Sequence, residues 1–145
     1  MSDVNARAEQ VTPFLMFEGR AEEAMNTYLT LFDDARVEHI HRYGPEGPGP
    51  EGSVMTAAFV IAGQRVLCSD SFVKHGFTFT PSLSLFVDCA AEEQLDRRFA
   101  ALSESGQVLM PPGDYGFSRK FAWVQDRFGV SWQLNLPART DNLPP

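Results

Sequence analysis

The fold of this chain is decided near its C-terminus by residues 123–137, which read WVQDRFGVSWQLNLP. Two runs rich in aromatic and β-branched residues flank a short turn-like segment at 126–129 that ends in glycine. This pattern predicts a β-hairpin that contains both tryptophans of the protein, Trp123 and Trp132. The polar Gln133 stands between two large apolar residues of the second predicted strand. Because a buried amide needs hydrogen-bond partners, Gln133 is either a satisfied core residue or a residue that faces a ligand.

The composition is that of one globular domain of 145 residues. The net charge is -7 and the 12 Lys and Arg residues form no basic stripe, so we expect no nucleic acid partner. No apolar run reaches about 18 residues, so we expect no membrane span. The N-terminus lacks the apolar core of a secretory signal, and Cys68 and Cys89 are isolated, which indicates reduced cysteines in a cytoplasmic protein.

Hydrophobic periodicity divides the chain into two halves with the same order of elements. In the first half we expect a strand at 11–17, a helix at 20–32, a strand at 35–43, a Pro/Gly loop at 44–52 and a hairpin of 53–61 with 65–70. After a connector at 71–81, the second half has a strand at 82–87, a helix at 91–105, a strand at 107–110, a Pro/Gly loop at 111–116 and the hairpin at 123–137. Asp88 is expected to cap the second helix, and Gly106 is expected to end it.

The predicted fold is therefore α+β, with two βαβββ modules at about 11–72 and 82–137 inside a single domain at 11–137. A flexible N-terminal arm at 1–10 and a C-terminal tail at 138–145 flank this domain. Each module has one helix to cover one face of its sheet, and the other face needs a partner or a ligand. We expect two such curved mixed sheets to form a cleft that suits a small molecule. The loop at 44–52 is then either a lid or an exposed linker.

The βαβββ repeat resembles the vicinal-oxygen-chelate fold of glyoxalase I, extradiol dioxygenases and the bleomycin- and fosfomycin-resistance proteins. Several segments more closely resemble its PhnB-like branch, which carries the label 3-demethylubiquinone-9 3-methyltransferase. These segments are TPFLMFEG at 12–19, AEEA at 21–24 with Tyr28, CSDS at 68–71, SLSL at 82–85, LMP at 109–111 and WVQDRFGVSWQL at 123–134. The resemblance covers about 11–137 and implies paired modules and a homodimer. It implies little about the reaction, because this fold hosts many chemistries.

The resemblance also gives a test for a metal. Metal-dependent members of the superfamily place His, Gln or Glu ligands on four strands, and the corresponding positions fall near Thr12, Thr56, Ser82 and Gln133. Hydroxyl groups and one neutral amide are poor ligands for a catalytic divalent ion, which prefers imidazole, carboxylate or thiolate. We therefore predict no metal and no other cofactor at these positions. A divalent metal bound through other ligands is the alternative.

Other polar residues each allow a functional and a structural interpretation. His39 and His41 share one face of a predicted strand, so they either form half of a metal site or are exposed strand histidines. Asp70 ends a predicted strand and is either a general base or a loop cap. Cys68 has no His or cation nearby in the sequence that would lower the pKa of its thiol.

Three functions remain open at this stage. The first is metal-free binding, with or without conversion, of a small, partly apolar molecule in the cleft; the others are a metal-dependent glyoxalase- or dioxygenase-type enzyme and a non-catalytic, drug-sequestering protein. The candidate ligand-binding residues are Thr56, Ser82 and Gln133 for polar contacts and Phe86, Trp123 and Trp132 for apolar walls, with Tyr115, Phe117 and Phe121 as further candidates. No glycine-rich strand–loop–helix of the nucleotide-binding type is visible, so the methyltransferase label has no evident S-adenosylmethionine site in the sequence.

Overall fold

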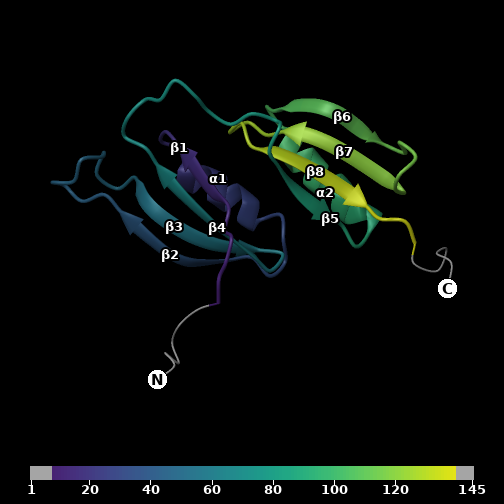
Figure 1. The fold of residues 1–145 in the computed structure, drawn as a ribbon, viewed down its shortest axis with the longest axis horizontal. Helices are drawn as coiled ribbons and strands as arrows, with labels where there is room; N and C mark the ends of the chain where they lie inside the picture. The colour runs from purple at the N-terminus through teal and green to yellow at the C-terminus, as the bar shows by residue number, and fades with distance from the viewer. Residues whose placement is uncertain (1–7, 140–145) are drawn as a thin grey trace. The chain divides into compact units, whose positions relative to one another are not determined.

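The structure is a computed structural model that describes residues 8–139 (Figure 1). Its elements are β1 (Phe14–Phe17), α1 (Ala21–Leu29), β2 (Arg36–Arg42), β3 (Val54–Ile61), β4 (Gln64–Asp70), β5 (Ser84–Asp88), α2 (Glu92–Ser103), β6 (Gln107–Gly113), β7 (Lys120–Gln125) and β8 (Ser131–Leu136). Most of the predicted arm and tail, 1–7 and 140–145, lies outside the described residues. Neither helix in the described part of the chain is long and apolar enough to cross a membrane.

The elements form two compact units, one up to Lys74 (module 1) and one from His75 onward (module 2). Their relative positions are not determined, and each is described by itself. Module 1 contains a four-stranded sheet of order β1-β4-β3-β2, and module 2 contains one of order β5-β8-β7-β6. β1 pairs in parallel with β4, and β5 pairs in parallel with β8; all other neighbouring strands are antiparallel. This confirms the predicted α+β fold of two βαβββ modules.

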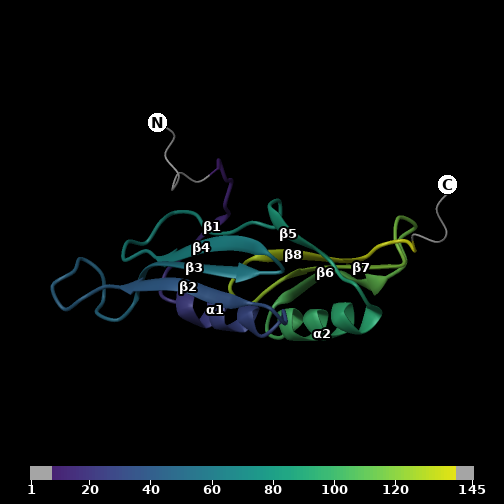
Figure 2. The same ribbon diagram turned by 90° about the horizontal axis from the view of Figure 1, so that it is seen from below.

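Each helix packs on one face of the sheet of its own module (Figure 2). The apolar stripe of α1 consists of Ala21, Ala24, Met25 and Tyr28, all at most 1% exposed, and the Tyr28 ring lies 6.4 Å from that of Phe59 on β3. These residues recur at helical spacing, which is why the helix can bury one side and solvate the other. Within residues 8–139, the opposite face of each sheet receives no helix from its own module.

Asp70, the last residue of β4, holds the start of α1 in place. Its Oδ1 accepts hydrogen bonds from the backbone N–H groups of Gly19 and Ala21, both at 2.9 Å, and its Oδ2 accepts one from Val54 at 3.3 Å. The residue that directly precedes the helix, Arg20, gives no side-chain cap, so a carboxylate from a distant strand satisfies the free N–H groups instead. The structure thus assigns Asp70 a capping role, at α1 rather than at the loop that follows it.

The hairpin of β7 and β8 is confirmed, and Asp126 organises its turn. This carboxylate is 5% exposed; its Oδ1 accepts from the backbone N–H groups of Phe128 (2.9 Å) and Val130 (3.0 Å). Its Oδ2 accepts from the indole Nε1–H of Trp132 at 3.0 Å. Gly129 adopts the positive φ of 96° that this turn requires and that glycine allows at little cost. One buried carboxylate therefore joins the turn to the tryptophan of β8.

Two predicted details of module 2 are wrong. Asp88 does not cap α2 but is the last residue of β5; the side chain of Gln94 caps the helix by accepting from the N–H groups of Ala90 (2.9 Å) and Ala91 (3.3 Å). The predicted loop at 111–116 is partly strand, because β6 continues to Gly113. As the last strand of its sheet, β6 has one edge without a strand partner, so its prolines remove no ladder hydrogen bond on that side.

Gly106 follows α2 but does not end it in the expected way. The helix ends at Ser103, and Ser105 rather than Gly106 takes the positive φ of 57°. Glycine is needed at position 106 for a close approach, since a Cβ there would clash with the backbone carbonyl of Gln125 on β7. The close contact joins the helix end to the hairpin.

Candidate functional site

The side chains of module 2 divide between two faces of its sheet. On the α2 side, Trp132 and Leu134 of β8 are fully buried, and Lys120 of β7 bonds Glu92 and Asp96 of the helix at 2.9 and 2.7 Å. Because strand side chains alternate, the neighbouring residues point to the other side. We call that side the Gln133 face; its residues are Ser84, Phe86 and Asp88 on β5, Ser131, Gln133 and Asn135 on β8, and Phe121, Trp123 and Gln125 on β7.

These residues form three rows across the strands. Gln125 pairs with Ser131 and Ser131 with Ser84 in the first row. Trp123, Gln133 and Phe86 form the second row, and Phe121, Asn135 and Asp88 form the third. Strand spacing places neighbours in a row about 5 Å apart and successive rows about 7 Å apart. The face is therefore polar in the first row, amide and aromatic in the second, and aromatic, amide and carboxylate in the third.

A chain of hydrogen bonds fixes the position of the Gln133 amide. Its Nε2–H donates to Ser84 Oγ at 3.2 Å, and Ser84 Oγ lies 2.6 Å from Ser131 Oγ. Ser131 also accepts from the indole Nε1–H of Trp123 at 2.9 Å and lies 3.3 Å from the carbonyl oxygen of Pro81. Ser84 Oγ also lies 3.4 Å from the Pro81 carbonyl oxygen, so either serine can donate to that carbonyl or to the other serine. The side-chain oxygen of Gln133 has no partner within the described residues and retains its capacity to accept.

Aromatic side chains surround the third row of this face. The rings of Phe86, Tyr115 and Phe117 lie 6.5, 6.1 and 5.0 Å from the ring of Phe121. Phe121 is 5% exposed, but Phe86, Tyr115 and Phe117 are 55, 41 and 60% exposed. We call these four residues the aromatic patch. Large aromatic surfaces left in water next to a fixed polar group are typical of a binding site rather than of a core.

The third row also contains a polar group with unused bonding capacity. Asn135 is 9% exposed and donates from Nδ2 to Asp88 Oδ1 at 3.0 Å. Its own Oδ1 is buried and has no hydrogen-bond partner among the described residues. Asp88 is exposed and forms no ion pair there. A buried carbonyl without a donor costs about 1–3 kcal/mol, and such groups are rare in folded proteins.

The structure brings three of the predicted site residues onto one face and places the others elsewhere. Phe86, Trp123 and Gln133 form the second row of the Gln133 face. Trp132 is fully buried on the α2 side, with its indole bonded to Asp126, so it belongs to the core, contrary to the expectation of a pocket wall. Ser82 precedes β5, is exposed, and pairs with Thr80 at 2.8 Å.

Ser84 is the residue that sequence reasoning missed. It lies two positions after Ser82 in the same SLSL segment, on the strand that pairs with β8, and it contacts Gln133 directly. Two serines with the same alternation could not be distinguished without knowing where the strand begins. Asn135, two residues after Gln133, shares its face by alternation, and this signal was available from the sequence.

Thr56 and Thr12 belong to module 1. Thr56 lies on β3, opposite His41 of β2, on the face of that sheet away from α1. The rings of His39 and His41 are 4.9 Å apart, and His39 Nδ1 is buried without a hydrogen-bond partner among the described residues. Thr12 precedes β1. Thr56 therefore has His41 as its cross-strand neighbour, and the ring of His41 in turn lies beside that of His39.

The donors at these positions do not suit a catalytic metal. Gln133 and Ser84 are neutral, and the amide N–H of Gln133 already donates to Ser84. Within residues 8–139 no three His, Cys, Asp or Glu side chains are grouped so as to hold a metal ion. Divalent ions of the zinc or iron type select imidazole, thiolate or carboxylate, so the Gln133 face suits hydrogen bonding to a ligand better than metal binding.

The cysteines do not provide a nucleophile. Cys68 is fully buried, and burial together with the nearby charge of Asp70 raises the pKa of its thiol to about 12. Burial also raises the pKa of the Cys89 thiol, although a contact of 3.5 Å from the Arg98 guanidinium opposes the shift. A reactive cysteine needs a depressed pKa and access to solvent. Both thiols are therefore structural at neutral pH.

Comparison with known proteins identifies the family. The family model described as 3-demethylubiquinone-9 3-methyltransferase matches residues 9–135. The chain belongs to this family. A solved structure of a family member, the putative 3-demethylubiquinone-9 3-methyltransferase PhnB protein from Bacillus cereus, is 53% identical with a TM-score of 0.86, and the match covers 88% of this chain and 99% of that chain. This confirms the predicted PhnB-like branch of the glyoxalase and vicinal-oxygen-chelate superfamily.

Other relatives and proteins of similar fold are more distant. Protein PA1353 from Pseudomonas aeruginosa is 27% identical with a TM-score of 0.79, over 91% of this chain and all of that chain. Protein YjdN of Escherichia coli is 24% identical over 140 residues, which cover 87% of this chain and 94% of that protein. The fosfomycin resistance protein FosX from Listeria monocytogenes is 10% identical with a TM-score of 0.63, over 96% of this chain and all of that chain, and it shows the shared fold alone.

Proposed function

We propose that the Gln133 face of module 2 binds a small, partly apolar molecule without a metal. The observation that carries this proposal is the side-chain amide of Gln133. Its Nε2 donates to Ser84 while its oxygen accepts no hydrogen bond within the described residues, and it lies in the same row as the exposed Phe86. A fixed amide can direct a polar group of a ligand, while aromatic surface removes the apolar part from water at about 25 cal/mol per Å².

The orienting chain of hydroxyls supports a binding role for Gln133. A core amide would have both its donors and its acceptor satisfied, since an unsatisfied buried group costs about 1–3 kcal/mol. Gln133 is instead only partly buried and has one described hydrogen bond. Thr56 of module 1 is proposed as a further polar contact on the sheet face of its own module, and Ser82 is replaced in this role by Ser84.

The family label does not by itself supply a methyl-transfer mechanism. In the structure, residues 44–52 connect two strands, β2 and β3, rather than a strand and a helix. A nucleotide-binding glycine loop uses the N-terminus of a helix to hold phosphate groups, so this loop does not fit that role. We propose binding of a small molecule, which both an enzyme and a sequestering protein require, and turnover of the bound molecule is tested separately.

A fragment screen tests this proposal. We expect thermal-shift hits among small molecules that combine an aromatic or aliphatic body with one polar group, and we expect them to perturb the side-chain amide resonance of Gln133 and the indole resonance of Trp123 in ¹H–¹⁵N spectra. Hits that perturb neither resonance would contradict it. A turnover assay on confirmed hits then separates an enzyme from a sequestering protein, and stoichiometric metal in the purified protein would favour the metal-dependent alternative.

The homodimer expected from the family remains a proposal. Several apolar side chains are strongly exposed in the described chain, among them Phe14 (53%) and Leu83 (81%), and burial of such surface is the usual driving force of association. Sedimentation equilibrium should give twice the chain mass of 16.1 kDa. A monomer at micromolar concentration would refute the dimer and leave the binding proposal unaffected.

A further inference from the structure

The third row of the Gln133 face contains a carboxylate and an amide oxygen that is unpartnered within residues 8–139. Asn135 Nδ2 donates one of its two N–H groups to Asp88 Oδ1 at 3.0 Å. The remaining acceptors are the other carboxylate oxygen of Asp88 and the buried Oδ1 of Asn135, which no donor reaches among the described residues. These two oxygens favour a ligand that supplies hydrogen-bond donors, and the carboxylate favours a donor that is positively charged.

The aromatic patch selects for the same kind of ligand. Phe121 is the partner of Asn135 across the β7–β8 pair, and Phe86 lies two residues before Asp88 on the same face of β5. Rings with exposed faces attract a cation through their quadrupole, by about 0.5–2 kcal/mol depending on how far the site is desolvated. Carboxylate and aromatic ring are about 7 Å apart along β5, so one ammonium group can lie between them.

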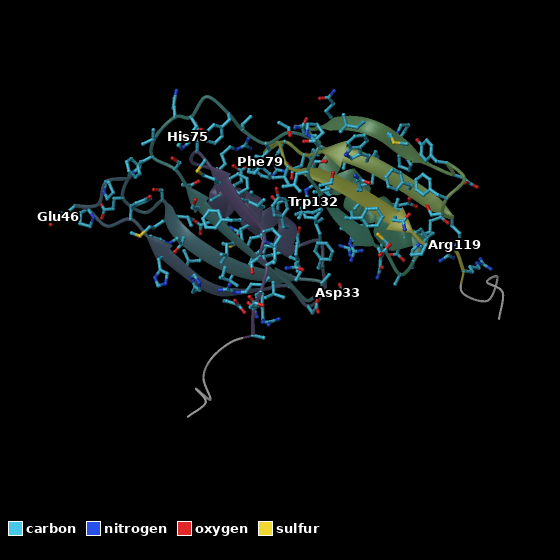
Figure 3. The ribbon with its side chains drawn as sticks, viewed as in Figure 1. Asp33, Glu46, His75, Phe79, Arg119 and Trp132 are labelled. Carbon is cyan, nitrogen blue, oxygen red and sulfur yellow. The ribbon has the colours of Figure 1, made fainter. Side chains whose placement is uncertain are left out.

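Charges around this row do not neutralise it. Lys120 points to the other side of the sheet, where it bonds Glu92 and Asp96. Arg119 lies near the end of β8, and its Nε donates to the carbonyl of Pro137 at 2.7 Å (Figure 3). Neither Arg119 nor Lys120 forms an ion pair with Asp88 within the described residues. The net charge of -7 adds a general attraction for cations.

We infer that the ligand of the Gln133 face is an organic cation, a protonated amine with an apolar body, whose ammonium group lies between Asp88 and the aromatic patch. The inference rests on the proposed binding function and specifies its ligand class. The ammonium group donates to Asp88 Oδ2, a small rotation of the Asn135 side chain brings its Oδ1 within reach of a second N–H, and the apolar body extends over Phe86 toward Gln133.

Three probes of the same size test the charge of the ligand. Phenethylamine is a cation at neutral pH, phenethyl alcohol is neutral, and hydrocinnamate is an anion. Each is titrated into the ¹⁵N-labelled full chain, with the side-chain amide resonances of Asn135 and Gln133 as site reporters. We expect the amine to bind at least about tenfold more tightly than the alcohol, the anion to bind most weakly, and the amine preference to shrink between about 0.01 and 1 M salt.

Two variants separate this inference from the proposed function. In Asp88→Asn the hydrogen bond from Asn135 can be kept while the charge is removed, so the amine should lose about tenfold in affinity and the alcohol should be unchanged. Glu93→Gln on α2, away from the face, changes the net charge equally and should leave both affinities intact. Equal binding of amine and alcohol at the reporters would overturn the cation inference but keep the proposed function. Preference for the anion would overturn the inference in favour of Arg119, and absence of any shift with all three probes would overturn both.

Discussion

Replacement of Asp126 by alanine should strongly destabilise module 2. The carboxylate accepts two backbone N–H groups of the turn and the indole N–H of Trp132, while being 5% exposed. Each buried donor left without an acceptor costs about 1–3 kcal/mol. Because the three donors do not lose their partner independently, we expect a total loss of about 3–5 kcal/mol, against a typical domain stability of about 5–15 kcal/mol.

Urea unfolding followed by tryptophan fluorescence measures this loss, since both tryptophans lie in module 2. Asp126→Asn is the intermediate case: it keeps an acceptor for the turn but opposes an amide N–H to the indole N–H, and it should cost less than alanine. Asp114→Ala is the matched control, because Asp114 is exposed and accepts one hydrogen bond, from Gly116 at 2.9 Å; it should cost less than about 1 kcal/mol. If the free energy of unfolding of Asp126→Ala lies within about 1 kcal/mol of the wild-type value, the assigned role of this carboxylate is refuted.

Three further changes test interactions inside each module. Asp70→Ala should lower the free energy of unfolding by about 2–4 kcal/mol because three backbone N–H groups lose their acceptor, whereas the exposed Asp34→Ala should have little effect; equal urea midpoints would contradict the capping role. Gly106→Ala should cost about 1–3 kcal/mol because its Cβ meets a backbone carbonyl of β7, while Gly44→Ala has open space and should be neutral by thermal melting. The pKa of the Cys68 thiol is about 12 in the folded protein and about 8.5 in the unfolded chain. The contribution of the protonated thiol to stability is therefore complete below about pH 8.5 and is lost as the pH rises toward 12. Cys68→Ala should flatten this decline of the free energy of unfolding with pH, and an unchanged slope would contradict the assignment.

The repeated order of elements could be predicted because it is written in local patterns. Apolar spacing marked both helices, and the turn composition at 126–129 marked the hairpin that the structure confirms. Two details were mispredicted: Asp88 ends β5 instead of capping α2, and β6 extends to Gly113. Prolines inside a strand are confined to sheet edges, strand starts and bulges, and the edge position depends on strand order, which no local pattern contains.

The candidate site was predictable only in part, because membership of the site depends on which face of the sheet a side chain occupies more than on its residue type. Trp132 and Gln133 are adjacent on β8, so they cannot both face a ligand, and alternation alone would have removed Trp132 from the site. The choice of Ser84 over Ser82 needed the start of β5. The unpartnered oxygen of Asn135 and the contact of Gln133 with Ser84 arise from pairing between strands that are 47 residues apart, and such pairing is visible only in the folded chain.

The most direct test of the account is the effect of Gln133→Ala on a ligand that the fragment screen has located on the Gln133 face. The change removes one hydrogen bond to Ser84, so the free protein should lose only about 1 kcal/mol of stability. Affinity for the ligand, measured by calorimetry, should fall about tenfold or more, while Gln107→Ala on the exposed edge strand β6 should leave it unchanged. Unchanged affinity in a destabilised Gln133→Ala variant would show that the amide is structural, and it would contradict the central claim.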